Sequence, residues 1–280
     1  MSAIHSLQPL YSMTGFGVGL LVGMTGVGGG ALMTPLLILL FGIHPATAVG
    51  TDLLYAAATK TAGSAVHGFN RTIDWRVVRL LATGSVPMTV VTVVTMNHVG
   101  IGSPAARDLI TLMLTIALFI TAATLIFRER IVARYAERLA ALQPKQVATL
   151  TIFVGAVLGV LVSITSVGAG AIGVTALVLL YPKLPTARIV GSDIAHAVPL
   201  TLAAGIGHWF LGSIDPDVLI SLLAGSVPGI LIGSYAAVRI PETALRLVLA
   251  GTLIVVATKL SLDMYPLRAN GVSVTAITAH

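Results

Sequence analysis

Cysteine is absent from this 280-residue sequence, and charged residues make up only 9% of it. Without cysteine the chain can form no disulfide, thiolate metal site or cysteine nucleophile. A typical soluble domain has about 25% charged residues, because its surface faces water. Since 56% of this chain is hydrophobic, the composition excludes a soluble protein and indicates an integral membrane protein.

Lysine and arginine are missing from the first 59 positions, and Lys60 is the first basic residue of either type. The N-terminus therefore lacks the basic region of a secretory signal. The net charge of +6 comes from residues in short connections between apolar segments. That placement fits the positive-inside pattern of membrane proteins better than nucleic-acid binding, so we expect no nucleic-acid partner.

Eight apolar segments follow one another, and several reach the roughly 20 residues that a helix needs to cross a bilayer. They cover about residues 13–41, 46–68, 75–97, 105–127, 147–181, 187–211, 216–238 and 243–264. The hydrophilic stretch 128–146 predicts a short amphipathic helix on the membrane surface. The expected organisation is a first membrane repeat (1–127), a basic cytoplasmic linker (128–146), a second membrane repeat (147–265) and a C-terminal tail (266–280).

The two halves of the chain repeat each other at an offset of about 141 residues. Val49-Gly50-Thr51-Asp52 returns as Val190-Gly191-Ser192-Asp193. The same offset relates His67 to His208, Ile73-Asp74 to Ile214-Asp215, and Gly84-Ser85-Val86-Pro87 to Gly225-Ser226-Val227-Pro228. A constant offset across unrelated motifs predicts that four segments were duplicated and fused.

The first segment of each half is glycine-rich in its middle, at residues 25–30 and 165–170. Glycine costs about 1 kcal/mol per residue in a helix interior relative to alanine, so Gly28-Gly29-Gly30 predicts a break in the helix. The alternative is close helix packing through small residues. If both segments are re-entrant hairpins, every basic connection lies in the cytoplasm, both termini lie outside, and the halves are inverted repeats. Eight full spans with both termini inside remain the alternative.

The sequence resembles the TauE/SafE family of sulfite exporters in three motifs. These are Gly23-Met24-Thr25-Gly26-Val27-Gly28-Gly29-Gly30, Pro35-Leu36-Leu37 and Ala48-Val49-Gly50-Thr51-Asp52. The resemblance spans nearly the whole chain and implies an all-α transporter of the bacterial inner membrane. It implies sulfite, sulfoacetate or a related sulfonate as the substrate anion. The second half departs from the pattern, with Ser163, Ser166 and Ala169 where the first has glycine.

Helix ends at the two breaks are suited to an anion, because free N–H groups and the helix dipole favour negative charge. We expect residues 27–30 and 167–170 to meet near the midplane. Lys60 lies well inside an apolar segment, where a charge costs at least about 2.5–3.5 kcal/mol. It either binds the anion or holds helices together. The candidate substrate-binding residues are Thr25, Gly28, Gly29, Gly30, Thr51, Lys60, Thr165, Gly168, Gly170 and Ser192.

Acidic and histidine residues are candidates for coupling or gating. Asp52 and Asp193 stand near the starts of two segments, where the alternative is a helix cap. Histidine titrates near physiological pH and can couple transport to protons, although a histidine near a segment end is more often interfacial. The histidine candidates are His67, His196 and His208, of which His196 lies deepest.

Three functional classes compete. A secondary transporter with alternating access suits the duplicated halves and paired breaks. A passive anion channel differs little from it in sequence. An intramembrane enzyme is the weakest, because Gly-x-Ser-x-Gly and His-Glu-x-x-His are absent. We expect no cofactor and no metal; the partners are a small sulfur-containing anion, the bilayer and, as candidate coupling ion, the proton.

Overall fold

The computed structural model describes residues 8–25, 30–237 and 242–269. Within these ranges the chain forms ten α-helices and no strand. The helices are α1 (Pro9–Thr25), α2 (Gly30–Phe41), α3 (Pro45–Phe69), α4 (Trp75–Val99), α5 (Pro104–Ala140), α6 (Pro144–Thr165), α7 (Ala171–Leu180), α8 (Thr186–Phe210), α9 (Pro216–Ala237) and α10 (Glu242–Ala269). The predicted all-α architecture is therefore correct.

Six of the described helices are long and apolar enough to cross a membrane: α4, α5, α6, α8, α9 and α10. Helix α3 has the length of a span, at 25 residues, but it carries Asp52 and Lys60 and is less apolar. Large apolar side chains such as Phe153 and Leu231 are exposed on the outer surface, as expected where lipid replaces water.

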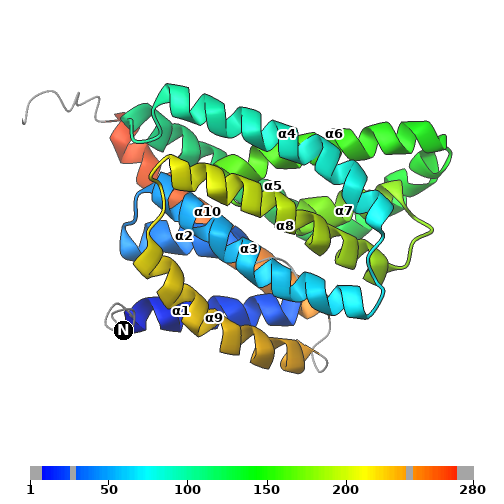
Figure 1. The fold of residues 1–280 in the computed structure, drawn as a ribbon, viewed down its shortest axis with the longest axis horizontal. Coiled ribbons are helices and arrows are strands. Elements are labelled where there is room, and N and C mark those ends of the chain that lie inside the picture. Colours follow the sequence, from blue (N-terminus) through cyan, green and yellow to red (C-terminus); the bar gives the residue numbers. More distant parts are fainter. Residues whose placement is uncertain (1–7, 26–29, 238–241, 270–280) are drawn as a thin grey trace, which may run out of the picture.

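Each glycine-rich first segment is two helices that return to the end of the molecule where the segment began (Figure 1). Tyr11, at the start of α1, stacks on Phe41, at the end of α2, with 4.4 Å between ring centroids. In the second half, the Thr151 and Tyr181 hydroxyls are 2.8 Å apart. Helix α7, with 10 residues, is about 15 Å long and cannot cross roughly 30 Å of hydrocarbon.

The halves pack reciprocally. Helix α1 lies along α9, its equivalent α6 lies along α4, and α3 pairs with α8. A methyl group on Gly84 of α4 would overlap the Ile152 carbonyl of α6, and one on Gly225 would overlap the Ser12 carbonyl of α1. These glycines therefore let paired backbones touch.

The stretch 128–146 differs from the prediction. It contains no separate surface helix, because α5 continues unbroken for 37 residues to Ala140. No glycine or proline interrupts residues 105–140, and Arg246 of α10 pairs with Glu129 at 3.5 Å. Pro144 then starts α6, a position where proline is favoured.

Candidate functional site

Helices α3 and α8 each bury one aspartate against a short helix of the same half. The Thr34 hydroxyl of α2 donates a hydrogen bond of 2.5 Å to Asp52, whose exposed fraction is 0%. Asp193 is also buried, and its carboxylate lies directly against Gly173 of α7. Each aspartate lies two turns inside its helix. The helix-cap interpretation of these two residues is therefore wrong.

The capping role belongs to two other aspartates. Asp74 accepts hydrogen bonds from the first turn of α4, and Asp215 does so for α9. The backbone N–H of Asp215 in turn donates to the Thr51 hydroxyl at 3.1 Å, and that of Asp74 to the Ser192 hydroxyl at 2.8 Å. The two hydroxyls that we predicted to bind substrate thus fasten one half to the other.

Lys60 lies two turns after Asp52 on α3 and interacts electrostatically with both Asp52 and Asp193. Its charge also acts on His196 of α8. No ion pair within 4.0 Å involves Lys60 in the part of the chain that the structure describes. The predicted residues Asp52, Asp193 and His196 thus lie within the range of electrostatic interaction with Lys60, and we call these four residues the polar cluster.

Two equivalent residues of α8 and α3, His196 and Tyr55, each lie near a serine of another helix. The His196 ring Nε2 lies 2.8 Å from the Ser85 hydroxyl of α4. At the position equivalent to His196, α3 carries Tyr55, whose hydroxyl lies near Ser226 of α9. Sequence reasoning missed Tyr55 and Thr34 as site residues. Their only signal was spacing: Tyr55 follows Asp52 by three residues, and Thr34 lies one turn after Gly30.

The α6–α7 break needs glycine at two positions. Gly168 and Gly170 have φ values of 121° and 125°, which side chains strongly disfavour. The Thr165 hydroxyl accepts the Val167 N–H at 3.1 Å and so stabilises the turn. Ser166, also in the left-handed region, lies near Asp52. The break of the second half thus reaches the aspartate of the first.

The remaining predicted residues fall elsewhere. Gly28 and Gly29 lie outside the described residues; Thr25 ends α1 and Gly30 begins α2. His67 Nδ1 contacts the Thr72 hydroxyl at 2.8 Å, and His208 Nε2 contacts the Ser163 carbonyl oxygen at 3.0 Å. Both histidines lie in the last turns of their helices and take part in local contacts outside the polar cluster.

Several buried polar atoms around the polar cluster make no hydrogen bond of 3.5 Å or less within the described residues, although Ser166 lies near Asp52 and Tyr55 near Ser226. They are Asp52 Oδ1, Tyr55 Oη, Ser166 Oγ, Asp193 Oδ1 and His196 Nδ1. Such atoms are rare in folded proteins, and several in one place suit a small polar ligand. Within the residues described, no three His, Cys, Asp or Glu side chains are grouped to hold a metal.

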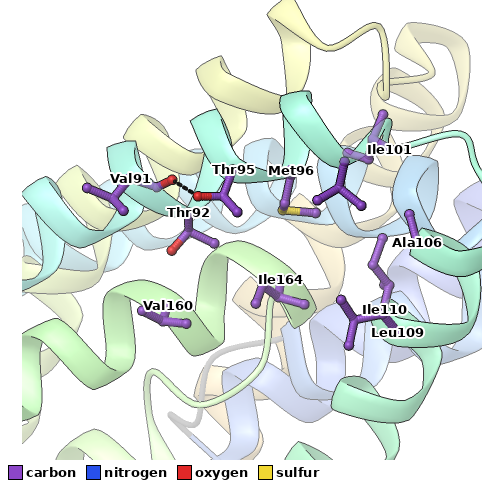
Figure 2. Close-up of a pocket in the computed structure, with 11 residues that line it drawn as sticks. Val91, Thr92, Thr95, Met96, Ile101, Ala106, Leu109, Ile110, Val160 and Ile164 are labelled. Carbon is purple, nitrogen blue, oxygen red and sulfur yellow. Dashed lines mark hydrogen bonds between the residues drawn. The ribbon is translucent and has the colours of Figure 1, made fainter.

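A cavity of about 220 Å³ between α4, α5 and α6 has a different character (Figure 2). Val91, Met96 and Ile110 line it, and the Thr95 hydroxyl is hydrogen-bonded to the Val91 carbonyl of its own helix. The lining contains no charged residue and no member of the polar cluster. This cavity is therefore unsuited to an anion.

Comparison with known proteins agrees with this arrangement. The family model for "Sulfite exporter TauE/SafE" matches residues 11–260. The chain belongs to the TauE/SafE family. It is 39% identical over 251 residues to the probable membrane transporter protein YjnA of Bacillus subtilis, covering 89% of this chain and 97% of that protein.

A second Bacillus subtilis protein of similar name, the probable membrane transporter protein YdhB, is 25% identical over 233 residues, which are 82% of this chain and 91% of that protein. No solved structure matches the chain. This TauE/SafE protein is a multi-pass transporter of the bacterial inner membrane, and its relatives are named as transporters, not enzymes.

Proposed function

We propose that this TauE/SafE protein is a secondary transporter that exports sulfite or an organosulfonate by alternating access. The observation that carries the proposal is the position of Lys60, which interacts with one aspartate from each half. A cation between the two halves, surrounded by polar atoms without partners, offers an anion a binding site that both halves can open in turn. The family name supplies the sulfur-containing class of substrate.

The orientation in the membrane follows from where basic residues lie. In Figure 1 the connections 70–74, 141–143 and 181–185 gather at one end, and 42–44, 100–103 and 211–215 at the other. The first group and its flanks contain Arg71, Arg76, Lys145, Lys183 and Arg188; the second group contains no Lys or Arg, and Arg107 is the one such residue within four positions of it. We place the basic end in the cytoplasm. The halves are then inverted repeats, and a reporter fused after His280 reads outside.

Charge balance supports coupling to protons. Two ionised aspartates around Lys60 would give the polar cluster a net negative charge and repel an anion. Binding of the anion therefore requires that one carboxylate be neutral. Asp52 receives the Thr34 hydrogen bond, whereas no hydrogen bond to the Asp193 side chain is found in the described residues. Since donors stabilise the ionised form, Asp193 is the proton carrier.

The test is flux in proteoliposomes with sulfite, thiosulfate, sulfoacetate and acetate, with and without a pH gradient. We expect saturable counterflow of one sulfur-containing anion, accelerated by the gradient. Flux that does not saturate and shows no counterflow would identify a passive channel instead. Absence of flux for every anion, in protein shown to be folded, would reject the proposed substrate class.

A further inference from the structure

A groove of about 330 Å³ opens at the basic end of the molecule, and no member of the polar cluster lines it. It lies between the start of α4, the junction of α5 with α6, and the segment joining α7 to α8. Two cationic side chains line it, Arg76 and Lys183. Most of the other lining is apolar: Leu139, Leu142, Pro144, Val147, Leu180 and Leu184.

The two cations of the groove are not neutralised by the protein. The lining contains no aspartate or glutamate, and neither Arg76 nor Lys183 forms an ion pair in the described part of the chain. Both side chains are exposed. Lys145 and Arg188, close in sequence to lining residues, add further positive charge. The groove therefore combines an unpaired positive charge with an apolar wall.

We propose that this groove binds the headgroup of an anionic phospholipid from the surrounding bilayer. Arg76 and Lys183 hold the phosphate, and the leucines contact the first methylenes of the acyl chains. Basic pockets between helices at the cytoplasmic surface have this preference for anionic lipids. The volume lies at the lower end of ligand pockets, which suits a headgroup with the tails left in the membrane.

A lipid in this groove would contact both halves at once. Arg76 belongs to α4 of the first half and Lys183 to the α7–α8 connection of the second. Beside the groove, Thr151 and Tyr181 already join α6 to the end of α7 by their hydroxyls. We therefore expect bound anionic lipid to raise the thermal unfolding temperature of the protein.

The experiment measures retention of phosphatidylglycerol and phosphatidylcholine by the full-length protein with native mass spectrometry. The test variant is Arg76→Gln with Lys183→Gln. The matched control is Arg134→Gln with Arg138→Gln, which removes the same charge from exposed positions of α5 outside the groove. Each cation in direct contact with the phosphate contributes at least about a factor of five, so the groove variant should bind phosphatidylglycerol roughly 25-fold more weakly.

We expect the control to bind phosphatidylglycerol within about twofold of the original protein, and neither variant to change the weaker retention of phosphatidylcholine. Equal loss in both variants would overturn the proposal, because it would show diffuse charge attraction. Equal retention of the two lipids by the original protein would also overturn it. A third arm adds inorganic phosphate: displacement of lipid at millimolar phosphate would assign the groove to a free anion instead.

Discussion

Gly84 of the first half packs against the backbone of Ile152 in the second, and its equivalent Gly225 of the second half packs in the same way against Ser12 in the first. Around the polar cluster this equivalence ends. Lys60 of α3 corresponds to Thr201 of α8, whose hydroxyl bonds the Ala197 carbonyl of its own helix.

Two other pairs of positions in the site also differ. Tyr55 of the first half corresponds to His196 of the second. Thr34, which donates to Asp52, corresponds to Val174 at the offset of 140 residues that also relates 25–30 to 165–170. The difference teaches that helix packing tolerated little divergence after duplication, because backbones in contact leave no room for a side chain. The polar cluster could specialise, because one cation is enough for one anion.

The largest expected effect on the rate of flux comes from replacing Lys60, which has no lysine equivalent in the second half. Lys60→Met should lower the initial rate of sulfite flux by about 100-fold, since truncating one partner of a hydrogen-bonded charge pair, here Lys60 with the bound anion, commonly costs about 2–5 kcal/mol. The matched change at the equivalent position, Thr201→Val, should alter flux by less than about twofold. Proteoliposome flux at equal protein content gives both numbers, and similar losses for the two variants would contradict a one-sided site.

A second comparison tests which of the two aspartates, Asp52 or Asp193, carries the coupled proton. Asp193→Asn should retain exchange of sulfite across the membrane but lose its acceleration by a pH gradient, because the proton carrier is gone. Asp52→Asn should keep the acceleration while lowering the rate. Initial rates with and without the gradient measure this, and the opposite assignment would follow if only Asp52→Asn removed the acceleration.

Gly84→Ala and Gly225→Ala test whether the two equivalent glycine contacts between the halves contribute equally to stability. Each added methyl group would overlap a backbone carbonyl, so each variant should lose about 1–3 kcal/mol of stability, and the two losses should be similar. Gly251→Ala, where nothing lies within 4 Å, is the matched control and should gain up to about 1 kcal/mol. Thermal unfolding in detergent compares the three. A loss of stability in only one of the two glycine variants would contradict the equivalence of these contacts.

The smallest expected effect concerns the hydroxyls that fasten the halves. Thr51→Val and Ser192→Ala each leave a backbone N–H, of Asp215 or Asp74, without its acceptor. Each should cost about 1–2 kcal/mol, measured in the same unfolding assay. If instead either variant lowered sulfite affinity without lowering stability, the original substrate-binding prediction for that hydroxyl would be restored.

The sequence predicted the framework well because its signals are long or repeated. The apolar segments stand out from the short polar connections, and the fixed offset between Gly50 and Gly191 already indicated equivalent packing. In the structure these two glycines lie against the backbones of Ser213 and Thr72. The glycine-rich stretch at 165–170 also corresponds to the observed end of α6 and start of α7.

The site was less predictable because side-chain neighbours depend on how helices cross. A cap remained the alternative for Asp52 because hydropathy located the helix start poorly, although Pro45 marks the first residue of α3. The electrostatic interaction of Lys60 with both Asp52 and Asp193 depends on the pairing of α3 with α8. The continuation of α5 to Ala140 was missed because a charged stretch was taken as the end of the span.

Binding of sulfite to purified protein tests the central claim most directly, because it isolates the site from the transport cycle. Isothermal titration should give an affinity for the original protein that falls at least about 30-fold in Lys60→Met, while Thr201→Val binds normally. An unchanged affinity in folded Lys60→Met would contradict the account and move the anion site away from the polar cluster.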